Sequence, residues 1–263
     1  MALAKGAILF DQDGTRKYHT GVSALALYVR LGTNDAAPNR AKYTPSGAET
    51  PTQCAVSLYA KGVAWDGITT ATNSPSGGDE TELWADNIKY GSMRAAEKSG
   101  GTIECYQYPP EFEVCNGNVI SNGVVVGQQA RRKFGFVYKS KVGNDATTDF
   151  GETLHIVWNA STSPSEHSNN TVNDSPDAGT FSFQYSSDSV AWTNPGQTLK
   201  PCSTMDIDTT TLDTAQKNAY AVLTSILYGK DETSEGAGDN IDAQLLSPDD
   251  VIAIMGTTFA AAG

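Results

Sequence analysis

Short stretches of alternating apolar and polar residues recur along this chain of 263 residues. The clearest lies at residues 181–186, FSFQYS, where every second side chain is aromatic. Residues 102–108 alternate in the same way and stop at Pro109 and Pro110. Successive side chains of a strand point to opposite faces, so this alternation predicts strands with one buried face. Further strands are expected at residues 22–31, 56–60, 63–69, 83–90, 124–126, 134–139, 154–158, 190–192 and 204–208.

One long segment has helical periodicity instead. Apolar side chains recur at steps of three and four between residues 211 and 229, which predicts an amphipathic helix. Thr211 or Asp213 can cap its start, and Gly229 suits its end. Many strands with one such helix indicate a mostly β protein of the α+β type, a β-sandwich or barrel with one flanking helix. Strands do not alternate with helices along the chain, which disfavours a doubly wound α/β sheet.

Two segments depart from this regular pattern. Residues 33–55 are rich in Asn, Pro, Thr, Ser and Gly and are too long for an ordinary connection. We expect them to form a long loop or arm that becomes ordered on a neighbouring subunit. Residues 240–263 form a C-terminal segment in which Ser247 and Pro248 predict the start of a short helix. A helical turn is also expected at residues 93–98, and we interpret the whole chain as a single domain with terminal arms.

The charge balance excludes several classes of protein. Eighteen basic and 30 acidic residues give a net charge of −12, which argues against binding nucleic acid through its phosphates or binding a membrane through basic residues. No apolar run approaches the length of about 20 residues that spans a bilayer, and the N-terminus does not read as a secretion signal. A soluble protein made in a cytosol, with no membrane partner, is the expectation. The four cysteines lack metal-ligand spacing and the three histidines stand alone, so we expect no metal site and no cofactor.

One motif suggests catalysis. The sequence ILFDQDGT, with Asp11 and Asp13, resembles the first motif of haloacid-dehalogenase-type phosphatases. In that chemistry the first aspartate attacks the phosphoryl group and the second acts as general acid, with Mg²⁺ bound nearby. The later acidic pair that the reaction needs is matched only poorly at residues 238–242, and the alternating βα units are missing. A solvated turn between two strands is therefore the preferred interpretation, and we expect no catalytic residues.

Charge is distributed unevenly along the chain. Residues 206–263 contain ten acidic and two basic residues, so this region alone carries −8 of the net −12. A basic cluster lies upstream and comprises Arg131, Arg132 and Lys133. A basic patch and an acidic region on one chain can pair head to tail between copies, so we expect the cluster to face an acidic neighbour. Candidate acidic partners in the C-terminal segment are Asp249 and Asp250. A solvated strand edge is the simpler alternative, and nucleic-acid binding is disfavoured by the negative surroundings.

Several stretches, in order, resemble one known family. They are DQDGTRKYHTGVSALALYV, GVAWDGIT, SPSGGDETELWADNIKY, GGTIECYQYPPEFEVCNG, GVVVGQQARRKFGFVYKSKVGND, FGETLHIVWNASTSPSEHSNNTVNDSPDAGTFSFQY, PCSTMDIDTT and LLSPDDVIAIMG. This ordered set covers most of residues 8–256 and resembles the major tail tube proteins of long-tailed, non-contractile bacteriophages, especially a group from phages of Gram-positive hosts. The chain departs from the family pattern at residues 33–55, where the family often has a much shorter link.

The resemblance implies a structural, non-enzymatic virion protein. Family members form rings, usually hexameric, that stack into a hollow tail tube, and inner-sheet strands from all subunits join into one barrel around the lumen. The implied partners are further copies of the chain, a tape-measure protein, the tail tip and tail terminator proteins, and DNA that passes without specific binding. The implied location is the virion tail, after synthesis in the cytoplasm of the bacterial host.

The acidic composition suits such a conduit, because an acidic lumen repels phosphates and lets DNA slide. Three acidic residues flank a predicted hairpin loop and are candidates for facing the lumen: Asp145, Asp149 and Glu152. Two alternatives to the tube stay open at this stage. They are the Mg²⁺-dependent phosphatase that would use Asp11 and Asp13, and a minor virion module that binds carbohydrate.

Overall fold

The computed structural model describes residues 16–33, 35–38, 41–46, 52–95, 97–165, 171, 178–191, 201–234 and 240–259. Strands make up 46% of it and helices 14%, which confirms the prediction of a mostly β fold with few flanking helices. The main sheet is antiparallel, and its strands run in the order β4-β1-β12-β13-β14-β9-β5. These strands are β1 (Lys17–Val29), β4 (Val63–Trp65), β5 (Ile68–Asn73), β9 (Glu97–Cys105), β12 (Phe134–Asn144), β13 (Gly151–Thr162) and β14 (Phe181–Ser187).

This sheet closes on itself into a barrel. Its first strand, β4, pairs with β1, and its last strand, β5, pairs with β9. Only Asp66 and Gly67 separate β4 from β5, so the two ends of the strand order meet at this point in the chain. Gly67 has a φ of +78°, a backbone conformation that glycine adopts without steric cost, and it allows the chain to turn from one pairing partner to the other. The segment 63–69, predicted as one strand, is therefore two.

Aromatic side chains fill the barrel interior. The ring of Phe112 lies at the centre of this cluster, with its centroid 4.4 Å from that of Trp65 and 4.8 Å from that of Phe183. Phe112 belongs to a 3-10 turn, η1 (Pro110–Phe112), which continues into the short helix α1 (Glu113–Asn116) and closes one end of the barrel. Phe183 comes from the alternating segment FSFQYS, so the strongest sequence pattern of the chain does mark a strand with one buried face.

A second core lies between the outside of the sheet and two helices, α2 (Thr214–Leu227) and α3 (Pro248–Met255). Leu154, Ile156 and Trp158 of β13 are buried there against apolar residues of α2. The side chain of Asp213 accepts a hydrogen bond from the backbone N–H of Gln216, and Ser247 caps α3 in the same way. Both predicted helices are thus confirmed, and local capping sets where each one begins.

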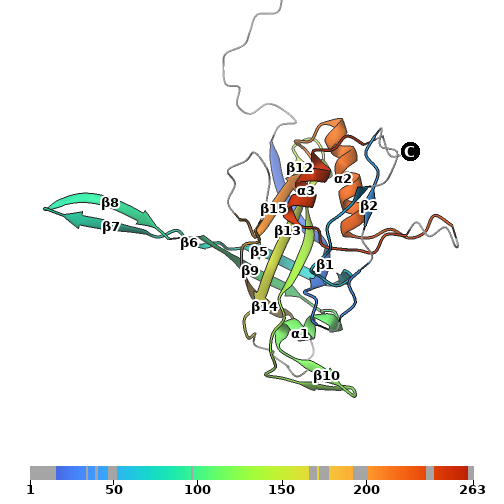
Figure 1. The fold of residues 1–263 in the computed structure, drawn as a ribbon, viewed down its shortest axis with the longest axis horizontal. Helices are drawn as coiled ribbons and strands as arrows, with labels where there is room; N and C mark the ends of the chain where they lie inside the picture. The colour runs from blue at the N-terminus through green and yellow to red at the C-terminus, as the bar shows by residue number, and fades with distance from the viewer. Residues whose placement is uncertain are drawn as a thin grey trace, which may run out of the picture.

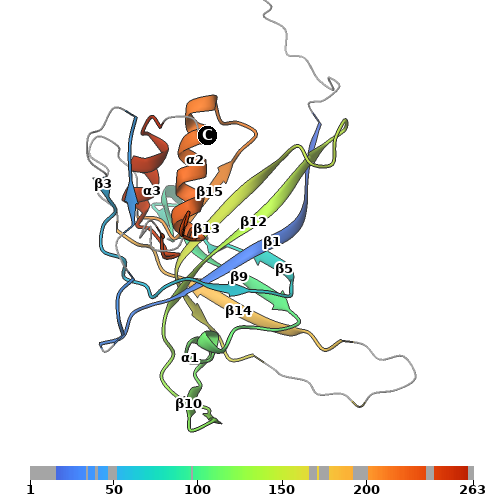
Figure 2. The same ribbon diagram turned by 90° about the vertical axis from the view of Figure 1, so that its right-hand side faces the viewer.

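One part of the sheet extends beyond the barrel. Strand β13 pairs with β14 only at residues 160–162, whereas its residues 153–157 pair with β15 (Thr204–Asp208). In this region the neighbouring strands are therefore β1, β12, β13 and β15, in that order. Figure 2 shows β1, β12 and β13 projecting away from the barrel, with α2 beside them. We call these four strands the extended sheet.

Two hairpins project from the body. The longer one consists of β7 (Glu80–Ala85) and β8 (Ile88–Arg94) and stands out sideways, next to the short strand β6 (Ser76–Gly77) (Figure 1). The shorter one consists of β10 (Val119–Ser121) and β11 (Val124–Val126) and follows α1. The prediction of a single strand at residues 83–90 is wrong, because the chain reverses at Asp86 and Asn87, both with positive φ.

Other expectations need smaller corrections. The helical turn predicted at residues 93–98 is wrong, since residues 93 and 94 end β8, and residues 97 and 98 begin β9. Residues 56–60 form only an isolated bridge between Tyr59 and Arg30. Of the predicted strand at residues 190–192, Val190 forms a bridge to Cys202, and residue 192 lies outside the described part of the chain.

Residues 33–55 contain two short paired strands, β2 (Lys42–Tyr43) and β3 (Thr52–Gln53). Their described part lies against this chain's own C-terminal segment. The rings of Tyr43 and Phe259 are 5.8 Å apart, and the backbone N–H of Ala55 donates to the carboxylate of Asp250 at 3.2 Å. Whether this loop also contacts a neighbouring subunit stays a prediction.

Candidate assembly site

The extended sheet has two open edges. Residues 17–24 of β1 pair with β12 on one side, and β4 joins the other side of β1 only at residues 25–27. Strand β15 pairs with β13 alone. Within the described part of the chain, no strand pairs with the second side of β15 or with the second side of residues 17–24 of β1, and residues 17–20 are exposed on both faces. An unpaired strand edge is a template for another strand, so these two edges are candidate assembly surfaces.

Two hydrogen bonds establish which backbone groups of β15 face outward. The N–H of Trp158 donates to the carbonyl of Ser203 at 2.9 Å, and the N–H of Thr209 donates to the carbonyl of Glu152 at 3.0 Å. Backbone groups of successive residues in an antiparallel strand point alternately to its two sides. Met205 and Ile207 therefore direct their N–H and C=O groups toward β13. The same groups of the alternate residues are directed toward the open edge: Thr204, Asp206 and Asp208.

One face of the extended sheet is covered by α2 and held to it by a charged cluster. The Nζ of Lys139 lies 2.7 Å from Oε1 of Glu152, and the hydroxyl of Tyr220 in α2 donates to the same oxygen at 2.6 Å. Lys139 Nζ also lies 5.4 Å from the ring centroid of Tyr228. Burial raises the pKa of Glu152, but the bonds from Lys139 and Tyr220 outweigh it and leave the pKa below its ordinary value.

The opposite face bears a chain of three polar side chains from three strands. The hydroxyl of Ser140 in β12 is 2.9 Å from Nε2 of His155 in β13. Nδ1 of His155 is 2.7 Å from Oδ1 of Asp206 in β15. The imidazole also stacks on Tyr138, with ring centroids 4.5 Å apart. We call this the Ser140–His155–Asp206 chain.

This order of atoms is the one found in serine hydrolases, where His Nε2 faces the serine and Nδ1 faces the aspartate. Hydrolysis also needs N–H donors beside the serine that stabilise the oxyanion. Strand β12 is paired on both sides around Ser140, with Val22 of β1 and Thr153 of β13, so its nearby N–H groups point into the neighbouring strands. The geometry therefore does not favour Ser140 as a nucleophile. It favours a structural role, in which the three side chains link the strands across the sheet and orient β15.

The sequence could not show this chain, because 15 residues separate Ser140 from His155 and 51 separate His155 from Asp206. In the structure His155 lies on the face opposite to Leu154 and Ile156. Among the described residues, no cluster of three or more His, Cys, Asp or Glu side chains is arranged to hold a metal ion. No helix in the described part of the chain is long and apolar enough to cross a membrane.

The basic cluster of Arg131, Arg132 and Lys133 has partners in its own chain. Arg132 forms an ion pair with Asp35, and Lys133 forms one with Asp188. The guanidinium of Arg131 donates to the carbonyl of Thr162 at 3.0 Å. The two ion pairs are substantially exposed to solvent, so they contribute little to stability.

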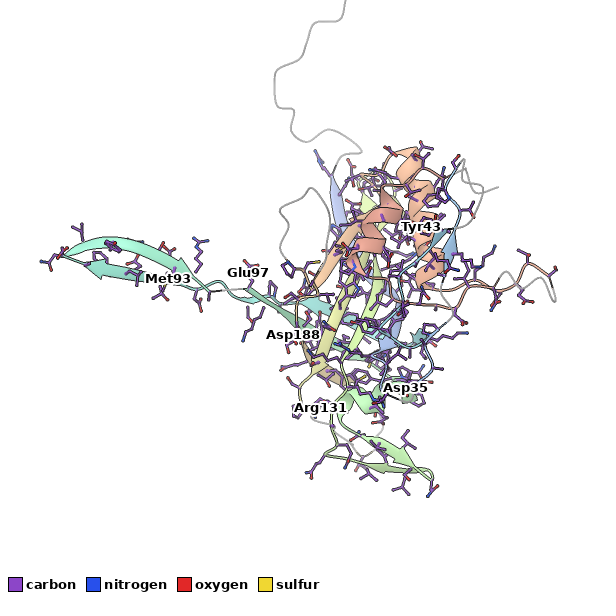
Figure 3. All side chains as sticks on the ribbon, viewed as in Figure 1. Asp35, Tyr43, Met93, Glu97, Arg131 and Asp188 are labelled. Carbon is purple, nitrogen blue, oxygen red and sulfur yellow. The ribbon has the colours of Figure 1, made fainter. Side chains whose placement is uncertain are left out.

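Arg131 lies in the lower part of the body near α1, whereas α3, which carries Asp249 and Asp250, lies in the upper part (Figures 1 and 3). The structure does not bring the basic cluster and these two aspartates together within one subunit. Asp250 is engaged at the start of α3, where its carboxylate accepts from the hydroxyl of Ser247 at 2.7 Å. Their contact across a subunit boundary stays a prediction.

The three acidic residues expected in the lumen occupy two environments. Asp145 and Asp149 are exposed within the loop that joins β12 to β13, and whether they face a lumen stays a prediction. Glu152 lies on the helix-covered face, in the cluster with Lys139 and Tyr220. Asp11 and Asp13, the pair that the phosphatase alternative requires, lie outside the described residues.

No protein-family model matches the chain. A search of curated proteins likewise found no match.

Proposed function

We propose that this chain is a structural virion protein that assembles edge to edge into closed rings, which stack into the tail tube of a long-tailed bacteriophage. The observation that carries the proposal is the extended sheet with its two open edges, at residues 17–24 of β1 and at β15. The ordered resemblance to tail tube proteins supplies the biological setting. Members of that family also join strands of neighbouring subunits into one sheet.

Two different open edges favour a ring over a symmetric pair. When the β15 edge of one copy meets the β1 edge of the next, the interface is heterologous, and an open row of copies keeps one free edge at each end until the circle closes. Closure removes all exposed edges, which is how barrels avoid uncontrolled aggregation. Four strands from each copy would form one continuous wall, and the resemblance implies six copies in each ring.

The face that α2 leaves uncovered is the face we assign to the lumen. It bears the Ser140–His155–Asp206 chain and Asp208, and Lys17 at the end of β1 donates to Thr210 at 2.6 Å. Aspartates on this wall repel DNA phosphates and favour passage over binding. In this arrangement Glu152 belongs to the outer face, while Asp145 and Asp149 lie at the rim loops.

Further partners follow from the same proposal. The tape-measure protein would occupy the lumen during assembly, and the tail tip and tail terminator proteins would contact the two ends of the tube. DNA would pass without specific binding. The protein would be made in the bacterial cytoplasm and act in the virion tail.

The variant Thr204→Pro tests the proposal. Negative-stain electron microscopy of the purified variant and of unmodified protein, over a range of salt concentrations, shows whether rings or tubes form. The N–H of Thr204 faces the open edge, so proline there removes an outward donor without breaking the bonds between β15 and β13. Unmodified protein is expected to form rings or tubes with a central hole. Thr204→Pro is expected to remain a folded monomer by circular dichroism and sedimentation.

Thr204→Val is the matched control, because it changes the side chain and keeps the backbone donor; it should assemble normally. Rings formed equally well by Thr204→Pro would overturn pairing through β15. Unmodified protein that stays monomeric at all concentrations, even with tail-tip components added, would overturn the proposal of a tube.

A further inference from the structure

The hairpin of β10 and β11 exposes apolar side chains on both of its faces. Val119, Ile120, Val124, Val125 and Val126 are between 42% and 61% exposed. Residues 114–130, which contain the hairpin, include no charged residue. An uncharged two-stranded ribbon rich in β-branched residues is marginally stable alone and prone to aggregate. Some apolar surface must cover it in the working state of the protein.

The hairpin of β7 and β8 has two chemically different faces. Cross-strand pairing places Glu80 and Glu82 on the same face as Lys89, which forms ion pairs with both at 3.5 and 2.7 Å. Trp84 belongs to this charged face, since it pairs with Lys89 and its indole donates to Glu82 at 3.2 Å. The opposite face contains Leu83, Ala85, Ile88 and Met93.

Nothing in the described part of the chain covers this apolar face. Ile88 is 63% exposed and Met93 57%. Figure 1 shows the hairpin pointing away from the body, on a different side from β10, and Figure 3 labels Met93 on it. The two apolar surfaces therefore cannot cover each other within one copy.

We propose that the β10–β11 ribbon of one copy is the docking site for the apolar face of the β7–β8 hairpin of another copy. The match is chemical, because each surface is apolar and neither brings a charge that burial would leave unpaired. This inference rests on the proposed function, and it adds a second contact that leaves the β1 and β15 edges free for ring closure. It therefore assigns the two hairpins to contacts between rings.

A protein occupant fits better than a lipid surface. The tip of the ribbon, the part that would enter a bilayer first, consists of the polar residues Ser121 and Asn122 followed by Gly123. The exposed valines lie behind this tip, along the two strands, where a second ribbon can lie against them. Binding to lipid is kept as an outcome of the test.

The experiment uses two variants that each disable one surface. Ile88→Lys places a charge on the apolar face of the long hairpin, and Val125→Glu places one on the ribbon. Both positions are exposed, so the fold should be kept, and edge pairing within rings should be unaffected. Each variant alone is expected to give rings that do not stack. Trp84→Lys, on the charged face, is the matched control and should stack normally.

Mixing rings of the two variants tests whether the surfaces meet each other. A Val125→Glu ring still has an intact hairpin, and an Ile88→Lys ring still has an intact ribbon, so the mixture should form pairs of rings and stop there. Electron microscopy counts single rings, pairs and longer stacks. If the unmodified chain made no rings, sedimentation of the same mixture would report pairing of single subunits, which separates this inference from the proposed function.

Three outcomes would overturn it: normal stacking by either variant, no pairing in the mixture, or loss of stacking by Trp84→Lys equal to that of Ile88→Lys. The lipid alternative is checked by co-sedimentation of unmodified protein with phosphatidylcholine vesicles. Vesicle binding that is lost in Val125→Glu and kept in Ile88→Lys would assign the ribbon to a membrane and contradict docking between copies.

Discussion

At the scale of single residues, the polar groups expected to contribute most to stability are those that join elements distant in the sequence. Glu152 links β13 to α2 because its carboxylate accepts from both Lys139 and Tyr220. Burial acts to raise its pKa, and these two bonds lower it further than burial raises it. A carboxylate whose pKa is lowered by folding stabilises the folded state above its unfolded pKa, here about 4.5.

The lowered pKa of Glu152 predicts how the stability of the folded protein changes with pH. The stabilisation from Glu152 is present above about pH 4.5 and is lost as the pH falls through its lowered folded pKa. Glu152→Gln should therefore reduce the free energy of unfolding by about 1 kcal/mol at pH 7, and this difference should shrink as the pH falls below about 4.5. Urea unfolding at pH 7 and over a descending series of pH values measures this. Asp149→Asn, an exposed acid of the neighbouring loop, is the control, and an equal loss in both variants would contradict the assignment.

Gly101 shows a constraint that no sequence pattern revealed. Strand β9 lies between β5 and β14, and a Cβ at residue 101 would lie 1.9 Å from the carbonyl oxygen of Thr72 and 2.8 Å from the hydroxyl of Tyr185. The strand expected from alternation began at residue 102, yet β9 starts at Glu97 and runs through this glycine. The close approach of three strands explains why a residue without a side chain stands there.

Gly101→Ala should destabilise the protein by about 3 kcal/mol, because the added methyl group meets backbone that cannot move without opening the barrel. Gly91→Ala is the matched control, since a Cβ at residue 91 has no heavy atom within 4 Å. Thermal unfolding should show a clear loss for the first variant and almost none for the second. Equal midpoints for both would mean that β9 and β5 are not packed as described.

At the scale of elements, the sequence correctly predicted the two longer helices, whose signals come from residues close together in the chain. The helix predicted at residues 211–229 is α2, and the short helix after Ser247 is α3, because capping and periodicity depend on nearby residues. The hairpin at residues 80–94 was missed because Leu83 to Tyr90 reads as one weakly alternating strand unless Asp86 and Asn87 are recognised as a turn. The helical turn expected at residues 93–98 was wrong because residues 93 and 94 pair with β7 and residues 97 and 98 pair with β6, and this pairing overrides a weak local helical pattern.

The candidate site depends even more on long-range pairing. Alternation predicted a strand at residues 204–208 but could not show that it joins β13 and leaves its other side open. The basic cluster was recognised as a group, while its partners Asp35 and Asp188 come from loops far along the chain. The valines at residues 124–126 were predicted as a strand, and only the structure shows that they are uncovered.

At the scale of the whole molecule, the fold combines a closed barrel with the extended sheet, whose two edges are unpaired. The aromatic interior and the turn from β4 to β5 complete the barrel within one chain. Within the described residues the extended sheet has no such closure, and we propose that further copies complete its edges at β1 and β15. The net charge of −12 opposes association at low salt, which predicts that assembly strengthens as salt screens the repulsion.

Hydrogen exchange at single-amide resolution, read on assembled protein and on the Thr204→Pro monomer, tests the central claim most directly. In the monomer, the N–H groups of Met205 and Ile207 should exchange slowly, because they face β13, while those of Asp206 and Asp208 exchange fast. In the assembly all four should be slow, with new protection in residues 17–24 of β1. Fast exchange at Asp206 and Asp208 in assembled protein would contradict edge-to-edge ring closure.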